Sequence, residues 1–186
     1  MTPKFVLISG SLCQESYNSA ALRAVGRIIE ERSQPSEAVV LPIGRLPYYI
    51  WEVEAAGTPT EVLAARAVVA EADVVIIGTP SYKGATPGVL NTALDWLSRP
   101  HGESVLAGKP VAVLSASPGR LSVLDARSAL LPVLDTAGAM VVGHSTFTVT
   151  CVEERLDPAG ELTGAEVLSA LRGLVETAAL AACVRP

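Results

Sequence analysis

The sequence predicts a three-layer, doubly wound α/β domain that takes in the whole chain, residues 1–186. Two observations predict this fold. Short apolar runs rich in valine and isoleucine recur along the chain, and the segments between them have the apolar spacing of helices. Uninterrupted apolar runs of this kind are typical of strands buried on both faces of a parallel sheet, with helices above and below it. Because strands and helices alternate, one domain of this class is expected.

Five apolar runs are the expected strands of the parallel sheet. They are FVLI (5–8), AVVL (38–41), VVII (74–77), VAVL (111–114) and AMVV (139–142). A five-stranded doubly wound domain most often has the flavodoxin-like strand order 2-1-3-4-5, and its ligand lies beyond the carboxyl ends of the strands. The loops that begin at Ser9, Thr79 and Ser115, after the first, third and fourth runs, are therefore the expected binding segments.

The expected helices are recognised by an apolar face and by their start signals. The face of the first is formed by Leu22, Val25, Ile28 and Ile29, and that of the last by Val167, Leu168, Leu171, Leu174, Val175 and Ala178. Asn18, Thr58-Pro59 and Thr86-Pro87 signal helix starts, with proline at the first helical position. The Pro- and Gly-bearing region 42–59 is expected to be a long connection within the domain.

Composition and charge exclude several functions. A chain that is 49% hydrophobic and 18% charged fits a globular domain with a sizeable core, and its net charge of -5 argues against nucleic-acid binding. The first apolar run is too short for a signal peptide, and charged residues interrupt the last apolar stretch, so no membrane span is expected. Three cysteines without CxxC spacing and only two histidines predict a reduced, cytoplasmic protein with no metal site. Gly108-Lys109 precedes a strand, which is the reverse of the geometry of a P-loop.

The first of the three loops, SGSLCQESYN (9–18), is rich in small hydrogen-bonding residues and contains no cation. A helix N-terminus can hold a phosphate through its free N–H groups, and the hydroxyls of Ser11 and Ser16 and the amide of Asn18 would add neutral donors. The alternative is that Ser16 or Asn18 simply caps the helix that follows.

The second loop, GTPSYKGATPG (78–88), contains two prolines and three glycines, which favour a rigid turn whose backbone groups stay free for a ligand. Backbone N–H groups from Ser81 to Gly84 could bond the edge of a flat heteroaromatic ring, beside the aromatic side chain of Tyr82. The alternative is an ordinary loop with an exposed tyrosine. The third loop, SASPGRLS (115–122), adds further hydroxyls, and a turn is expected at Gly119.

Taken together, GSLCQESYN, TPSYKGATPGVLNTALDWLSRP and GKPVAVLSASPGR resemble the NADPH-dependent FMN reductase family, in order and over nearly the whole chain. The resemblance implies a flavodoxin-like oxidoreductase that binds FMN, uses NADPH or NADH as co-substrate and passes electrons to a quinone or similar small acceptor. The flavin carries the chemistry, so no catalytic side chain is implied. The resemblance also implies a homodimer or homotetramer, with the helix that carries Asp95 and Trp96 in the contact.

The same resemblance assigns FMN contacts to particular residues. It places the phosphate at Ser11, Ser16 and Asn18, the isoalloxazine ring against Pro80, Ser81, Tyr82, Lys83 and Gly84, and Ser115, Ser117 and Gly119 on the other side of the ring. Arg120 is either a contact for an NADPH phosphate or a solvated surface arginine.

The sequence departs from the family pattern at positions near the expected cofactor. Cys13 stands where an arginine is common, so a phosphate contact is lost and FMN binding is expected to weaken; the thiol is either reactive or a tolerated substitution. Lys83 stands where an asparagine is common, and either stabilises reduced flavin or points to solvent. LNTA (90–93) and Ser122-Val123 replace the common LKNA and Gly-Gly.

These departures keep two alternatives open: an electron carrier without a substrate site, and a non-catalytic flavin-binding or accessory protein with weakened FMN affinity. A cluster of Tyr48, Tyr49 and Trp51 in the long connection either walls a substrate pocket or forms a subunit contact.

Overall fold

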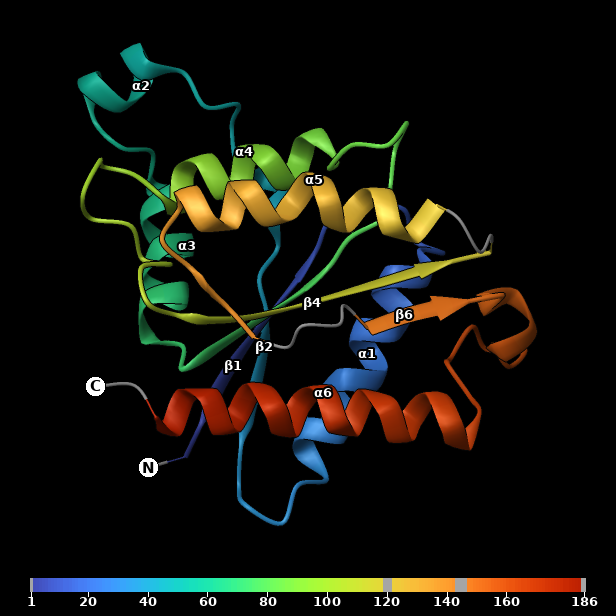
Figure 1. The fold of residues 1–186 in the computed structure, drawn as a ribbon. Coiled ribbons are helices and arrows are strands. Elements are labelled where there is room, and N and C mark those ends of the chain that lie inside the picture. Colours follow the sequence, from blue (N-terminus) through green and yellow to red (C-terminus); the bar gives the residue numbers. More distant parts are fainter. Residues whose placement is uncertain (1, 119–121, 143–146, 185–186) are drawn as a thin grey trace.

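The computed structural model describes residues 2–118, 122–142 and 147–184. Its strands are β1 (Lys4–Ser9), β2 (Glu37–Val40), β3 (Val74–Gly78), β4 (Pro110–Ser117), β5 (Met140–Val141) and β6 (Phe147–Thr150) (Figure 1). Its helices are α1 (Tyr17–Glu30), α2 (Trp51–Ala56), α3 (Thr60–Glu71), α4 (Gly88–Leu97), α5 (Ser122–Thr136) and α6 (Ala165–Cys183), and the short 3-10 turns are η1 (Ile43–Arg45) and η2 (Val152–Arg155).

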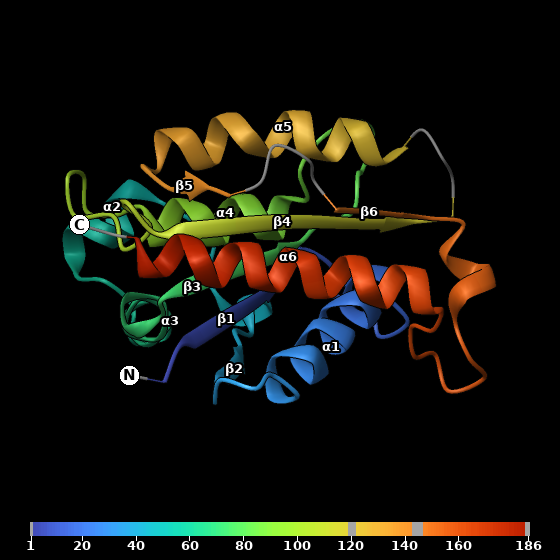
Figure 2. The ribbon, with the colours of Figure 1, turned by 60° about the horizontal axis from the view of Figure 1, so that its bottom comes forward.

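The sheet is parallel with the order β2-β1-β3-β4-β5, which confirms the predicted strand order. Helices α1 and α6 cover one face, and α3, α4 and α5 cover the other (Figure 2). Successive side chains of β1 point to opposite faces of the sheet, so this strand contributes to both layers of the core. Phe5 and Leu7 pack with the α1 and α6 side, whereas Val6 and Ile8 pack with the opposite side.

The fifth position of the sheet differs from the prediction of one strand over 139–142. Only β5 forms there, and β6 then pairs with the end of β4, where Leu114 lies opposite Phe147 (Figure 2). The β6 sequence, FTVT, alternates polar and apolar residues, so a search for uninterrupted apolar runs misses it. The expectation that every strand is buried on both faces is also wrong for β2, because it is an edge strand whose Val40 is 65% exposed.

The predicted apolar faces of α1 and α6 are confirmed, with Leu168 and Leu174 only half-buried. The helix starts need small corrections. Ser16, not Asn18, caps α1, because its Oγ accepts a hydrogen bond from the N–H of Ser19 at 3.3 Å. Pro59 and Pro87 are N-caps and not first helical residues, since both keep an extended ψ. Among the described residues, no helix combines the length and apolarity needed to cross a membrane.

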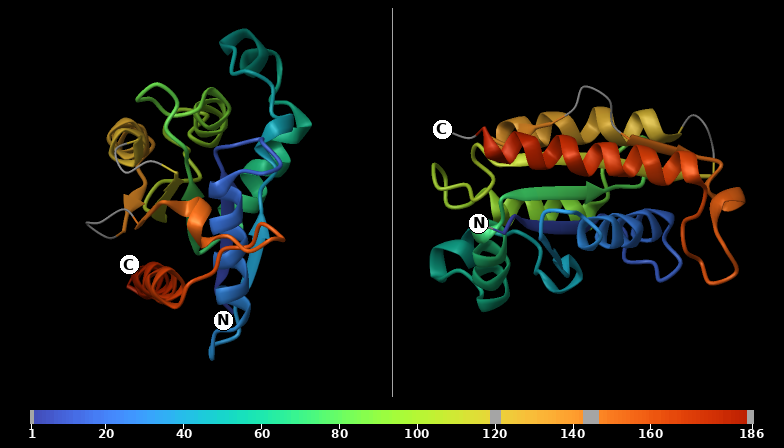
Figure 3. Two further views of the ribbon diagram at one scale, coloured as in Figure 1. Left: turned by 90° about the vertical axis from the view of Figure 1, so that its right-hand side faces the viewer. Right: turned by 90° about the horizontal axis from the view of Figure 1, so that it is seen from below.

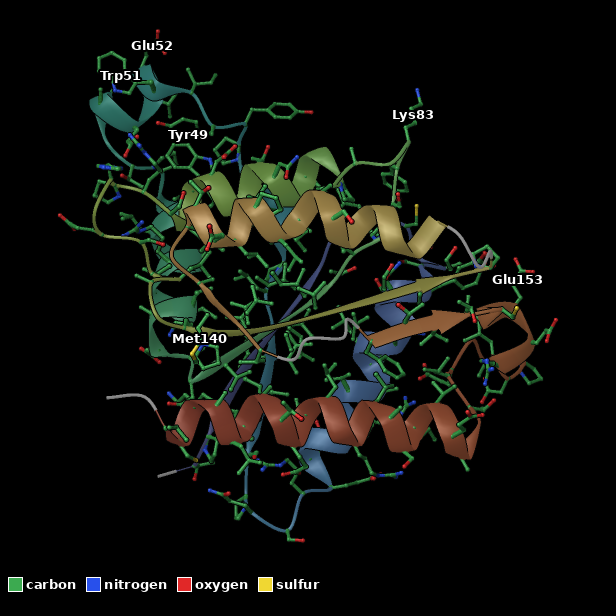
Figure 4. The ribbon with its side chains drawn as sticks, in the orientation of Figure 1. Tyr49, Trp51, Glu52, Lys83, Met140 and Glu153 are labelled. Carbon is green, nitrogen blue, oxygen red and sulfur yellow. The ribbon has the colours of Figure 1, made fainter. Side chains whose placement is uncertain are left out.

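The long connection between β2 and α3 contains η1 and α2, and α2 stands away from the sheet (Figure 1). Its aromatic residues do not form the predicted cluster. Tyr49 turns inward, with its ring 5.0 Å from that of Trp96 and its hydroxyl 2.8 Å from a carboxylate oxygen of Glu54. Tyr48 and Trp51 are 79% and 64% exposed, and Figure 4 shows Tyr49 and Trp51 at separate places on this segment.

Ion pairs that join α1 and the turn after it to the C-terminal part of the chain predict that acid destabilises the fold. A hydrogen bond from Arg27, supported by one from Arg23, lowers the pKa of Glu161, and a hydrogen bond from Arg32 lowers the pKa of Glu176. A carboxyl whose folded pKa lies below its ordinary value of 4.5 contributes stability that is complete above that value. This contribution disappears as the pH falls through the folded pKa.

We therefore expect the free energy of unfolding, measured in urea between pH 7 and pH 3, to decline once the pH falls below about 4.5. The double variant Glu161→Gln, Glu176→Gln lacks both titrating groups, so its decline should be shallower. An identical pH dependence in the variant and the wild type would contradict this explanation.

Candidate functional site

The three loops predicted to bind a ligand meet at the carboxyl ends of the strands, the side that faces the viewer in the left panel of Figure 3. They surround a hollow of about 280 Å³. Its lining residues are Ser11, Cys13, Glu15, Ser16, Tyr17, Asn18, Pro80, Ser81, Tyr82, Ala116, Ser117 and Pro118. Residues about 100 positions apart therefore come together as the fold class predicts.

In the first loop, Ser11 and Ser16 are both buried, and the hydroxyl of each accepts a backbone hydrogen bond. Ser11 Oγ accepts from the N–H of Cys13, and Ser16 Oγ accepts from the N–H of Ser19, each at 3.3 Å. A hydroxyl that accepts in this way keeps its own proton to donate. The first N–H groups of α1 have no acceptor within the helix, so the loop presents donors suited to an anion.

Asn18 lies at the hollow, but its side-chain amide bonds the backbone of β4. Its Nδ2 donates to the carbonyl oxygen of Ala116 at 3.1 Å, and its Oδ1 accepts from the N–H of Ala116 at 2.9 Å. The residue is only 2% exposed. The sequence predicts either a phosphate donor or a helix cap at Asn18, and the contact with β4 is a third role that depends on the fold.

The second loop folds into a two-residue hairpin. Tyr82 and Ala85 exchange two backbone hydrogen bonds of 3.1 Å, and between them Lys83 and Gly84 have φ angles of 55° and 75°. Two consecutive positive φ angles are typical of a type I′ turn. The hairpin uses the N–H of Tyr82, so this group is no longer available from the donors predicted between Ser81 and Gly84.

The structure separates the predicted ring contacts of this loop into two groups. Pro80, Ser81 and Tyr82 line the hollow, whereas Lys83 and Gly84 lie at the exposed hairpin tip. Figure 4 shows Lys83 pointing away from the body of the molecule, which favours the interpretation of a solvent-facing lysine.

Lys83→Asn is expected to stabilise the protein, because asparagine tolerates the left-handed conformation better than lysine does. A gain of about 0.5–1 kcal/mol would raise Tm by roughly 1–4 °C for a chain of this size. Thermal unfolding followed by circular dichroism measures it, with Lys4→Asn, at the exposed first residue of β1, as a control that has no such turn to relieve. A lower Tm for Lys83→Asn would show that the turn does not prefer asparagine.

In the third loop, Ser115 does not reach the hollow. It is 1% exposed, and its Oγ donates to the carbonyl oxygen of Thr79 at 2.7 Å, which ties β4 to the second loop. Ser117 does line the hollow. Gly119 and Arg120 lie outside the described residues, and the backbone at Ser122-Val123 begins α5.

Two features of the site were missed in the sequence. Glu15 and Tyr17 line the hollow, as their place between Ser11 and Asn18 could have indicated. Glu15, Ser16 and Tyr17 also border a second hollow, of about 420 Å³, whose far side is formed by the turn 156–160. The two hollows therefore adjoin over the start of α1.

The fold and the position of the hollow define a flavodoxin-like protein with a ligand site at the carboxyl ends of its strands. Residues 3–154 match the NADPH-dependent FMN reductases, and the chain belongs to that family. It is therefore an oxidoreductase of the class that depends on FMN and NAD(P)H. The resemblance identified in the three motifs is confirmed.

Several relatives share much of the chain. It is 30% identical to a 2-hydroxy-1,4-benzoquinone reductase from a Burkholderia species over 178 residues, which is 95% of this chain and 94% of that protein. It is 38% identical to a quinone reductase from Pseudomonas putida, over 67% of this chain and 65% of the relative. FerB, a flavoenzyme NAD(P)H:(acceptor) oxidoreductase from Paracoccus denitrificans, superposes with a TM-score of 0.85 at 26% identity and covers 99% of both chains.

Proposed function

We propose that the protein binds FMN in the hollow and transfers electrons from NADPH or NADH to a quinone or a similar small acceptor. The convergence of the three loops on one hollow is the observation that carries the proposal, and the quinone reductases among the relatives support the choice of acceptor. Bound FMN would take a hydride from NAD(P)H and, with one further proton from solvent, reduce a quinone to a hydroquinone.

The residues of the first loop fit the phosphate of FMN. The hydroxyl protons of Ser11 and Ser16 and the free N–H groups at the start of α1 are neutral donors, and the helix dipole favours a negative charge at this point. Backbone and hydroxyl donors alone can hold a phosphate, so the absence of an arginine at Cys13 weakens the site without removing it.

The other two loops fit a flat ring. Pro80, Ser81 and Tyr82 form one wall of the hollow and Ala116, Ser117 and Pro118 the other, so the ring would lie between the end of β3 and the end of β4. Ser115 and Asn18 hold these walls in place through backbone contacts and are proposed as supports of the site. Lys83 and Gly84 lie outside the hollow and are proposed to shape the hairpin.

The test begins with the visible absorption spectrum of the purified protein, before and after addition of excess FMN and desalting. A retained flavin band followed by NAD(P)H oxidation with a quinone is the expected result. Retained flavin without NAD(P)H oxidation would favour an electron carrier. A colourless protein after desalting would favour the accessory protein and overturn the proposal.

The proposal includes a homodimer or homotetramer in the cytoplasm, where NAD(P)H is available. Tyr48, Ile50 and Trp51 expose apolar surface on the connection that carries α2, and such surface is typical of protein contacts. Trp96 is 1% exposed and its indole N–H donates to the carbonyl oxygen of Pro47, so it supports this connection from within the chain.

Trp51→Glu should shift the molar mass, measured by light scattering after size-exclusion chromatography, toward that of the single chain. Val184→Glu, which replaces another exposed apolar residue far along the sequence, is the control. An unchanged mass for Trp51→Glu would place the subunit contact elsewhere.

A further inference from the structure

At the end of β4, the side-chain amide of Asn18 makes the hydrogen bonds that a neighbouring strand would make. On the β3 side of β4, strand pairing stops where Gly78 lies opposite Leu114. Two residues further on, the side-chain amide of Asn18 makes both hydrogen bonds to Ala116 that a neighbouring strand would otherwise make. The two residues are 98 positions apart, and both are buried.

This contact joins the two halves of the hollow. Asn18 stands in the first turn of α1, next to the Ser16 cap and the free N–H groups, whereas Ala116 and Ser117 form part of the opposite wall. Because Asn18 bonds both the N–H and the carbonyl of one residue, it fixes the start of α1 in distance and in orientation relative to β4. A single hydrogen bond would leave the helix free to pivot.

A second contact extends this support to the remaining loop. The Oγ of Ser115, the residue before Ala116, donates to the carbonyl oxygen of Thr79 at 2.7 Å, and the N–H of Thr79 donates to the carbonyl oxygen of Leu114 at 3.0 Å. The end of β4 therefore holds the first loop through Asn18 and the second loop through Ser115. A shift at Asn18 changes the separation of the walls that border the hollow.

We propose that Asn18 is a positioning residue that sets the spacing between the phosphate end and the ring end of the flavin site. The inference rests on the proposed function, because it concerns binding of FMN at both ends. A ligand that must reach both ends depends on their spacing, whereas a fragment that occupies one end does not.

The first test compares Asn18→Ala with the wild type by titration with FMN and with lumiflavin, which has the ring but no phosphate chain. We expect FMN affinity to fall at least about tenfold and lumiflavin affinity to stay nearly the same. Only FMN contacts both the phosphate end and the ring end of the site, so only its binding depends on the spacing between them. At saturating FMN, the flavin absorption band and the midpoint potential should also shift, because a displaced phosphate end would draw the attached ring into a different position between its walls. Arg27→Gln, which weakens the far end of the same helix, is the control and should lower stability without these shifts.

The second test follows hydrogen exchange at the amide of Ala116 in the protein without flavin. Exchange should be fast in Asn18→Ala and slow in Asn18→Asp, because a carboxylate still accepts from the N–H of Ala116. This comparison remains informative if Asn18→Ala folds poorly.

Three results would overturn the inference. One is unchanged exchange at Ala116 in Asn18→Ala. Another is weaker FMN binding with the flavin spectrum and potential unchanged, which would make Asn18 a direct phosphate donor. A wild-type protein that retains no FMN would overturn the proposed function and this inference together, whereas the first two results leave the proposed function intact.

Discussion

Replacing Lys109 by methionine is expected to lower the free energy of unfolding by about 2 kcal/mol. Lys109 is 3% exposed, and its ammonium group donates to the carbonyl oxygens of Ala70, at 3.2 Å, and Ala72, at the C-terminal end of α3. Each hydrogen bond from a charged group to a buried carbonyl is worth about 1.5–3 kcal/mol, and the helix dipole favours a cation here. Methionine keeps the apolar stem but leaves these carbonyls without their donor.

The expected loss is smaller than the sum of the two bonds, because methionine also avoids the desolvation of a buried ammonium group. For a chain of this size, a loss of about 2 kcal/mol lowers Tm by roughly 4–8 °C. Urea and thermal unfolding followed by circular dichroism measure both quantities. Lys4→Met is the matched control, since Lys4 contacts Glu71 at the same end of α3 but at the surface. Equal Tm values for the Lys109 and Lys4 variants would contradict a structural role for the buried lysine.

Cys13→Arg is expected to strengthen FMN binding by about 1–3 kcal/mol, which is roughly 5- to 150-fold in Kd. Cys13 is exposed in the first loop and lines the hollow beside the buried hydroxyls of Ser11 and Ser16. An arginine at this position would add a charge-assisted contact to a phosphate held there. Glu15 also lines the hollow and competes for the guanidinium group, so the lower half of the range is expected.

Two controls test whether the gain in FMN affinity comes from the charge of the arginine and not its size, and whether it comes from the phosphate of FMN and not the ring. Cys13→Gln adds length without charge and should bind FMN nearly as the wild type does. Riboflavin, which lacks the phosphate, should gain nothing from the arginine. Isothermal titration at low and high salt should show the FMN advantage shrinking as ionic strength rises. An equal gain for riboflavin, or no gain for FMN, would place the phosphate away from Cys13.

The topology of the sheet and the location of the hollow can be predicted from the sequence, because both follow from the order of the strands. Buried apolar runs separated by helices leave few arrangements, and the loops after β1, β3 and β4 must then share one end of the sheet. The family resemblance then implies the individual residues Pro80, Ser81 and Ser117, and all three line the hollow.

The roles of Asn18, Ser115 and Lys109 could not be predicted in the same way. Each is a polar side chain that bonds the backbone of a residue more than 30 positions away, so its role depends on which strand or helix end lies beside it. Local patterns describe neighbours within a turn or along a strand. For this reason the sequence predicts a cap or a ligand donor at Asn18, and Gly108-Lys109 before a strand serves only to exclude a P-loop.

The short edge strand β2 bears on the behaviour of the protein at high concentration. An exposed edge with valine side chains is a template on which further chains can add as strands, and such addition leads to aggregation. β2 is only four residues long and begins with Glu37, so it offers an incoming strand little length and an unfavourable charge. Brevity and an acidic residue thus protect this exposed edge of the sheet, and lengthening β2 with apolar residues would remove that protection.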